Sequence, residues 1–310
     1  MLTTSPFFKM LSHLYGLAVL ARLQAYHLHI MKEKRLSGMV VSIGNITVGG
    51  TGKTPMTMFL AQRLLDRGYK PAILSRGYKG QLPRQPVAVD TSFWGDWKKY
   101  GDEPFLMATR LSDIPVIVAK NRYLAGLYAM QRFDRRVFLL DDGYQHIHLY
   151  RNINILLINA KNPFGSGFLL PRGPLREPLD QIKRANLVII TKVNQVKQEG
   201  LREVREIISK FNPLTPVFHS RFLAQHLISV RNPSGFPLDL LKEKRILAFS
   251  GIADPHSFKQ LLEETGSEIT DHLIFPDHYQ YKDRDLEKIR QKAVIMGAKI
   301  IITTELESKP

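Results

Sequence analysis

The hydrophobic positions of this chain fall into short apolar runs that alternate with longer amphipathic stretches. Six apolar, β-prone runs predict strands at residues 40–43, 72–74, 116–119, 137–141, 153–158 and 187–191. Apolar residues at helical spacing predict helices at residues 54–67, 103–111, 122–132 and 201–211. Near-continuous apolar strands alternating with helices are typical of a mainly parallel sheet with helices on both faces. The pattern therefore predicts an α/β fold.

A second, shorter series of the same kind follows. We expect strands at residues 245–250, 269–275 and 299–303, and helices at 257–265 and 282–296. The segment between residues 213 and 235 is rich in proline and glycine, which interrupt regular structure, so we expect a domain boundary there. The predicted organisation is an N-terminal helix in residues 1–35, a core domain in 36–220 and a smaller C-terminal α/β domain in 221–310.

The N-terminal segment, residues 6–30, is apolar and helix-compatible, with Lys9 and Arg22 inside it. Its longest uncharged run, residues 10–21, is shorter than the ~20 residues that a helix needs to span a bilayer. An amphipathic helix lying in the membrane interface fits this pattern. The alternative is an amphipathic helix packed on the protein's own core.

A glycine-rich turn connects the first predicted strand of the sheet to the first helix after it. It reads GGTGKT, and the order strand, glycine-rich turn and helix is typical of a phosphate-binding loop. Backbone N–H groups at a helix N-terminus can bind phosphate, and glycines let the backbone approach closely. The expected phosphate-binding residues are Gly49, Gly50, Thr51, Gly52, Lys53 and Thr54.

Within this turn, Lys53 would reach the β- and γ-phosphates and the Thr54 hydroxyl would ligate Mg²⁺. The strict motif G-x-x-x-x-G-K-[ST] has glycine where this chain has Thr47. A glycine-rich turn that only caps a helix is the alternative.

The apolar run FLL ends in Asp141 and Asp142, followed by glycine. Acids at the carboxyl end of a strand beside a phosphate loop can hold Mg²⁺ directly or through water. The alternative is a common Asp-Gly turn. Together with the phosphate loop, the two acids favour a nucleotide site.

Other polar residues follow predicted strands or lie in loops. Arg76 and Arg122 follow two strands and could neutralise phosphate charge, although most arginines are surface cations. Asp102, in GDEP, fits either a general base or a helix N-cap, and capping is the commoner use. His278 and Glu177 lie in predicted loops, and their spacing alone assigns them no role.

The chain has 310 residues, no cysteine and a formal net charge of +16. The absence of cysteine excludes disulfides and thiol nucleophiles. The positive charge fits nucleic acid, an anionic membrane surface or a phosphorylated substrate. No nucleic-acid-binding module is recognisable, so we expect no nucleic acid partner.

The ordered motifs resemble one family, the tetraacyldisaccharide 4'-kinases, which are the lipid A kinases of Gram-negative bacteria. The matching segments are GGTGKTP, SRGYK, GDEP, LDDGYQH, PRGPLREP, SGIADP and FPDHY, over nearly the whole chain. The resemblance implies a P-loop NTPase core with an N-terminal membrane-associated helix and a smaller C-terminal α/β domain. It implies Mg²⁺-dependent transfer of the γ-phosphate of ATP to the 4'-hydroxyl of the lipid A disaccharide 1-phosphate.

The resemblance also implies roles for individual residues and a location. Asp102 and His278 would form a catalytic dyad that activates the sugar hydroxyl, with Lys53 also catalytic. The implied metal residues are Thr54, Asp141, Asp142 and Glu177, and Arg76 and Arg122 would line the nucleotide site. We expect a monomer on the anionic cytoplasmic face of the inner membrane, bound peripherally or monotopically.

The family usually continues after the strand near residue 300 with TEKDAVK, whereas this chain reads TTELESKP. We therefore expect part of the last domain to be missing or altered. Two other functions fit the residues alone. One is a soluble P-loop kinase of another sugar or cofactor, and the other is a P-loop NTPase switch.

Overall fold

The computed structural model describes residues 5–78, 80–81, 84–93, 97–230, 235–277 and 279–304. The chain divides into two compact units, Met1–Ser220 and Arg221–Pro310.

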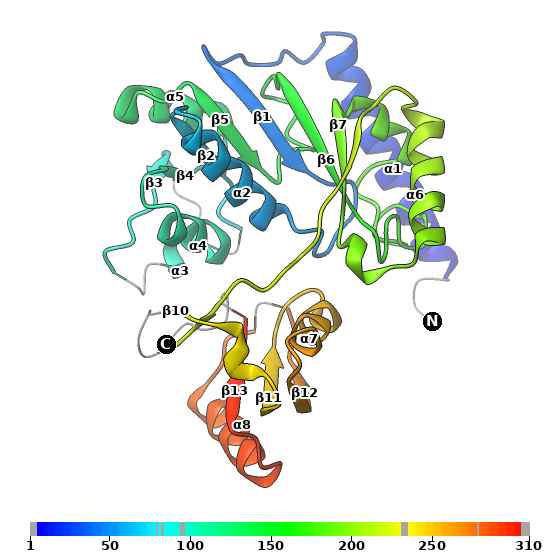
Figure 1. Cartoon of the computed structure of the whole chain (residues 1–310). Helices are drawn as coiled ribbons and strands as arrows, with labels where there is room; N and C mark the ends of the chain where they lie inside the picture. Colours follow the sequence, from blue (N-terminus) through cyan, green and yellow to red (C-terminus); the bar gives the residue numbers. More distant parts are fainter. Residues whose placement is uncertain are drawn as a thin grey trace. The chain divides into compact units, whose positions relative to one another are not determined.

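The first unit is built on an eight-stranded sheet with the strand order β3-β4-β2-β5-β1-β6-β7-β8 (Figure 1). The strands are β1 (Met39–Gly44), β2 (Pro71–Ser75), β3 (Val87–Ala88), β4 (Val116–Val118), β5 (Val137–Asp141), β6 (Ile153–Asn159), β7 (Leu187–Thr191) and β8 (Val217–His219). Neighbouring strands pair in parallel, except that β3 is antiparallel to β4. The structure thus confirms the mainly parallel sheet. The short edge strands β3 and β8 were not predicted.

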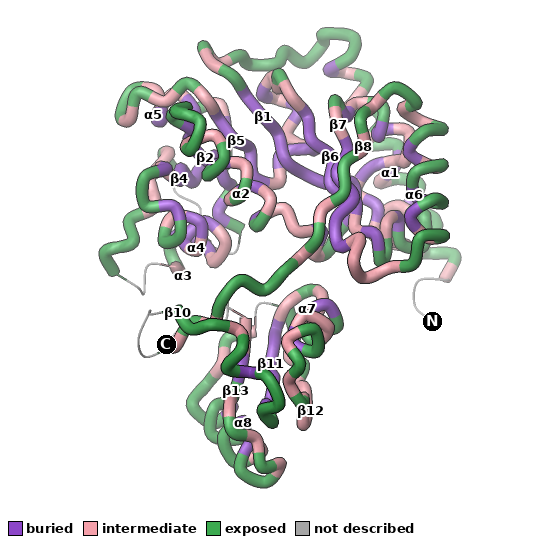
Figure 2. The backbone as a smooth tube through the Cα atoms, viewed as in Figure 1, coloured by how far each residue is buried: buried purple, intermediate pink, exposed green. Residues whose placement is uncertain are grey.

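Helices cover both faces of this sheet because successive residues of each strand point to opposite sides. On one face, Val41 and Leu139 pack in the cluster that contains residues of α2 (Lys53–Asp66) and α4 (Asp102–Arg110). On the other face, Val40 and Phe138 pack with α5, and strands β6 and β7 pack with α6. The bounds of these last two helices are Arg122–Phe133 and Gln198–Phe211. The six inner strands are therefore buried along most of their length, whereas the edge strands β3 and β8 are not (Figure 2).

The N-terminal segment forms one long helix, α1 (Pro6–His27). Its buried residues are Ser12, Gly16 and Tyr26. Large apolar side chains on the helix are exposed, among them Phe7, Met10, Leu14 and Leu17. Among the described residues, no helix has both the length and the hydropathy that a membrane crossing requires.

Short helical turns complete the first unit: α3 (Trp97–Tyr100), η3 (Leu179–Arg184) and η4 (Val193–Gln195). The second unit has a three-stranded parallel sheet with the order β12-β11-β13. Its strands are β11 (Arg245–Ser250), β12 (Glu268–Ile274) and β13 (Ile300–Ile302), and its helices are α7 (Pro255–Glu263), α8 (Asp283–Ile295) and the turn η5 (Leu238–Leu241). Strands β9 (Leu227–Ile228) and β10 (Gly235–Phe236) pair separately and antiparallel.

Candidate active site

The predicted phosphate loop joins β1 to α2. Gly52 caps the N-terminus of α2 with φ 81°, and Gly49 has φ 107°. Both angles lie in the left-handed region that side chains disfavour, so glycine is required by the backbone at these two positions. Thr47 has no positive φ, which explains why this chain can do without the glycine of the strict motif there.

Three polar side chains from neighbouring strand ends hold this loop in place. Asn45, fully buried after β1, donates through Nδ2 to Thr51 Oγ1 at 2.9 Å. Thr191 Oγ1, at the end of β7, donates to Thr51 O at 3.1 Å. Asn159 Nδ2, at the end of β6, donates to Gly50 O at 3.4 Å. None of these three residues was among the predicted site residues; their place directly at or after a strand end was the available signal.

Asp141, at the end of β5, is buried without a cation directly on it. Its Oδ2 accepts a hydrogen bond from Ser75 Oγ at 3.2 Å, whereas its Oδ1 is buried with no hydrogen-bond partner. Burial raises the pKa of Asp141 to about 7, and the nearby carboxylates of Glu103 and Asp142 add to the rise. A buried acid oxygen without a partner costs free energy, which a bound cation would relieve.

Asp142 is the member of the acidic pair that contacts basic side chains. Arg176 Nη1 donates to both of its oxygens, at 2.8 and 3.0 Å, and Lys53 Nζ lies 3.8 Å from Oδ1. Burial opposes ionisation, but Lys53 and Arg176 hold the pKa of Asp142 below its usual value. The structure therefore brings together the phosphate loop and the acidic pair, as the sequence predicted.

Arg122 adds a buried cation beside this cluster. Only 4% of the residue is exposed, and its Nη1 donates to Lys120 O at 3.3 Å. Burial lowers the pKa of Arg122 to about 10, while Asp141 acts in the opposite direction. Arg76 is exposed at the end of β2 and is close enough to Arg122 to lower that pKa further. Both predicted arginines thus lie near the acidic pair.

Asp102 is the first residue of α4, and Gly101 occupies the N-cap position with φ 94°. A Cβ on Gly101 would lie 2.6 Å from Tyr78 O, so the loop after β2 packs directly on the start of α4. The next residue, Glu103, acts electrostatically on Asp141. The helix-cap alternative for Asp102 does not match this arrangement, because the capping position belongs to Gly101.

Glu177, a further predicted metal residue, does not contact the acidic pair. Glu177 is buried in an ion pair with Arg184. Burial raises the pKa of Glu177, although Arg184 opposes the rise. His278 lies outside the described residues. Within those residues, no group of three or more His, Asp or Glu side chains is placed to hold a metal ion.

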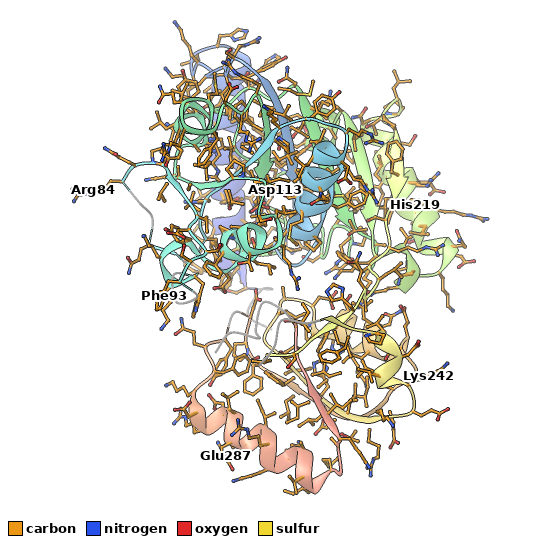
Figure 3. All side chains as sticks on the ribbon, turned by 60° about the vertical axis from the view of Figure 1, so that its left-hand side comes forward. Arg84, Phe93, Asp113, His219, Lys242 and Glu287 are labelled. Atoms are coloured by element: carbon orange, nitrogen blue, oxygen red, sulfur yellow. The ribbon has the colours of Figure 1, made fainter. Side chains whose placement is uncertain are left out.

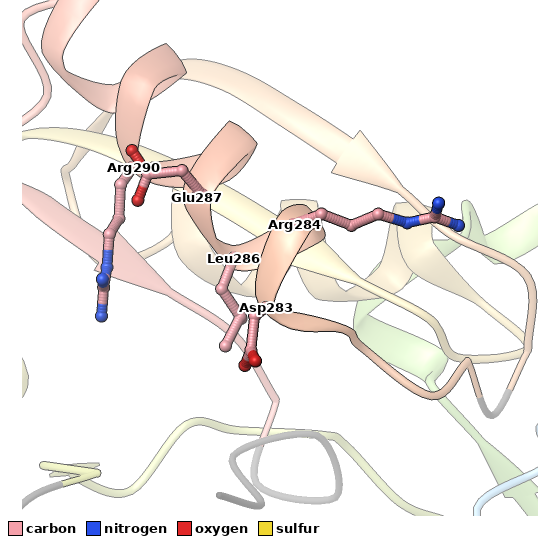
Figure 4. A pocket seen from close by; sticks show the side chains of 5 residues that line it. All are labelled: Asp283, Arg284, Leu286, Glu287 and Arg290. Carbon is pink, nitrogen blue, oxygen red and sulfur yellow. The ribbon is translucent and has the colours of Figure 1, made fainter.

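Each unit has a surface hollow among its described residues. One, of about 440 Å³, lies beside the N-terminus of α5; Arg84, Lys120, His146 and His148 contribute its basic and imidazole groups. The other lies on α8 in the second unit, where Arg284 and Arg290 extend in opposite directions (Figure 4). All residues of this second hollow come from one helix, and they form no cluster aimed at a common point.

Comparison with known proteins agrees with these features. Residues 4–307 match the family model described as tetraacyldisaccharide-1-P 4'-kinase. The chain is 39% identical over 296 residues to the tetraacyldisaccharide 4'-kinase of Pelobacter propionicus, covering 95% of this chain and 80% of that protein. It is 39% identical over 312 residues to the enzyme of the same name from Syntrophus aciditrophicus, covering 97% and 83%.

A solved structure is similar as well. It is the "apo" form of LpxK from Aquifex aeolicus in complex with ATP, with a TM-score of 0.75 and 32% identity. The match covers 99% of this chain and 90% of that one. With a family match over nearly its whole length, the chain belongs to the tetraacyldisaccharide-1-P 4'-kinase family.

Proposed function

We propose that this protein transfers the γ-phosphate of ATP to the 4'-hydroxyl of a tetraacyldisaccharide 1-phosphate, a step of lipid A biosynthesis. The observation that carries the proposal is the contact between Lys53 of the phosphate loop and Asp142 after β5. It joins a phosphate-binding helix N-terminus to an acidic pair within a member of this kinase family. A glycine-rich turn that only caps a helix would not require an acidic pair beside it.

The residues that would bind the phosphates of ATP are Gly49, Gly50, Thr51, Gly52, Lys53 and Thr54. Lys53 would move from Asp142 towards the transferred phosphate, since an ammonium group is attracted to the developing negative charge. Arg122 is held close to Asp141 and Arg76 lies at the same sheet edge, so both are suited to neutralise phosphate oxygens. Phosphoryl transfer depends mainly on such positioning and charge neutralisation.

The residues fit a Mg²⁺ ion. Asp141 has a buried oxygen without a partner and a raised pKa, which is the state expected of a ligand that lacks its cation. Thr54 and Asp141 would hold the ion, with Asp142 beside them, and Mg²⁺ would supply charge neutralisation at the phosphates. Glu177 as a further ligand stays a prediction, because its carboxylate is paired with Arg184 here.

Asp102 is proposed as the general base that takes the proton of the acceptor hydroxyl. Asp102 is the first residue of α4. The residue before it, Gly101, packs closely on the loop following β2, and this packing fixes the position of Asp102. Its pairing with His278 comes from the family resemblance and stays a prediction.

The acceptor is an acylated lipid, so the enzyme has to reach a membrane. The exposed apolar residues of α1 and the net charge of +16 support attachment to an anionic surface. We propose a monomer bound peripherally or monotopically at the cytoplasmic face of the inner membrane. The basic hollow beside α5 offers groups that suit the 1-phosphate of the acceptor.

The test is transfer of label from γ-labelled ATP to the disaccharide 1-phosphate in mixed micelles with Mg²⁺. We expect lipid-dependent product from the wild type and a loss of at least about 100-fold in kcat in Asp102→Asn, in the range typical of general bases. Asp113→Asn is the matched control, because Asp113 is exposed in the turn between α4 and β4 (Figure 3). ATP hydrolysis without lipid product would favour the NTPase switch, and unchanged activity in Asp102→Asn would remove the base assignment.

A further inference from the structure

Helix α1 has a second face, opposite its exposed apolar one, that is bonded to the segment 168–177. Ser12 Oγ donates to Leu169 O at 2.8 Å, and Tyr15 OH donates to Arg176 O at 2.9 Å. Gly16, the residue after Tyr15, packs closely on the same segment, because a Cβ there would be 2.9 Å from Leu169 Cδ1. Both ends of the segment are therefore fastened to the same helix.

The segment is closed on itself and attached to the phosphate loop. Leu175 N donates to Phe168 O at 3.1 Å, and Leu170 N donates to Leu175 O at 2.9 Å. Arg176 N donates to Ile46 O at 2.7 Å, and Val48 N donates to Pro174 O at 2.8 Å. These backbone bonds place the segment between α1 and the residues that lead into the phosphate loop.

The side chain of Arg176 leaves this segment towards the acidic pair. Its Nη1 contacts both oxygens of Asp142 and lies 3.4 Å from Gln145 Oε1. Gln145 Nε2 in turn donates to Asn45 O at 2.9 Å, at the end of β1. The backbone of Arg176 is thus fixed by Tyr15 while its guanidinium fixes Asp142.

We propose that Tyr15 is a positioning residue of the phosphoryl-transfer site, acting through Arg176 on Asp142. The inference rests on the proposed kinase function and extends it to a helix that carries no catalytic group. Because the hydroxyl holds a backbone oxygen, it constrains where the Arg176 side chain begins, and a small displacement of a charged group at a reaction site has a large effect on rate. The same helix exposes its apolar face, so the element proposed to contact lipid would also fix the site.

The test is Tyr15→Phe, which removes one hydroxyl and keeps the ring. We expect kcat for lipid phosphorylation to fall about tenfold with the KM for lipid within twofold. Tyr69→Phe is the matched control, because Tyr69 is exposed between α2 and β2 and lies outside segment 168–177. This control should keep kcat within twofold.

A double-mutant cycle separates positioning from loss of stability. In an Arg176→Gln background, Tyr15→Phe should change kcat less than twofold, because the path through Arg176 is already broken. Amide hydrogen exchange should rise in segment 168–177 of Tyr15→Phe and stay unchanged in Tyr69→Phe. Independent, multiplying effects of the two substitutions, or unchanged exchange in the segment, would overturn the inference.

The exchange measurement needs no acceptor, so it also separates this inference from the proposed function. If the wild type formed no lipid product but exchange rose in Tyr15→Phe as described, the kinase assignment would fail while the link from α1 to the segment remained. If lipid product formed normally in Tyr15→Phe, the positioning role would fail while the kinase assignment stood.

Discussion

At the carboxyl ends of the strands beside the phosphate loop, charged residues differ in which neighbouring groups balance their charge. Asp142 has Lys53 and Arg176, whereas one oxygen of Asp141 has no partner. His146 presents a similar case on the basic side, because its Nε2 is buried without a hydrogen-bond partner. Burial lowers the pKa of His146 to about 3, and Arg122, His148, Arg151 and Arg22 contribute in the same direction.

The shifted pKa of His146 predicts a pH dependence of stability. In the unfolded chain the imidazole takes up a proton near pH 6.5, whereas in the folded protein it does not. The neutral imidazole therefore contributes to the unfolding free energy above pH 6.5, and this contribution is lost as the pH falls. From pH 7 to pH 5 the wild type should lose about 2 kcal/mol of unfolding free energy more than His146→Gln does. Chemical denaturation at both pH values measures this.

The same substitution at exposed His13 is the control for that experiment. Equal pH dependence in the wild type and His146→Gln would show that the imidazole is not the group responsible.

At the scale of elements, the sequence predicted the six inner strands of the first sheet, the three strands of the second sheet and the helices of eight or more residues to within about three residues, because long apolar runs carry a strong signal. The two-residue strand β3 and the outer strand β8 were missed; they are short, and β8 lies in the proline-containing segment where only a boundary was expected. The ion-pair partners of the acidic residues in the site were harder to predict. Glu177 faces Arg184, and Arg176 reaches Asp142, only because a long loop folds back on the phosphate loop.

The proposed role of helix α1 in membrane binding can be tested directly. Leu14 and Leu17 lie one turn apart on the exposed apolar face, with 55% and 63% of their surface accessible. The double change Leu14→Gln/Leu17→Gln should weaken binding to anionic vesicles at least about tenfold, since each leucine loses roughly 1.5–3 kcal/mol of apolar burial. Vesicle sedimentation measures the change.

The matched control is Leu214→Gln/Leu223→Gln, which alters two exposed leucines outside the regular helices and strands. Its vesicle binding should equal that of the wild type. An equal loss in both double variants would mean that exposed leucines in general, and not α1, attach the protein.

At the scale of the whole molecule, the net charge of +16 and the apolar face of α1 should make separable contributions to the proposed membrane attachment. Charge attraction is screened, with a Debye length of about 10 Å at 0.1 M salt and about 3 Å at 1 M, whereas apolar burial is not weakened by salt. Raising salt from 0.1 to 1 M should therefore reduce wild-type binding to anionic vesicles but leave a salt-resistant fraction.

In the Leu14→Gln/Leu17→Gln variant that resistant fraction should fall sharply, because charge alone then holds the protein on the vesicle. Uncharged phosphatidylcholine vesicles provide the complementary control, on which wild-type binding should be weak and nearly independent of salt. If high salt released the wild type completely, attachment would be electrostatic and the apolar face of α1 would not enter the membrane. If salt had no effect on wild-type binding to anionic vesicles, the positive charge would have no part in membrane binding. It would then serve to bind the phosphorylated substrates instead.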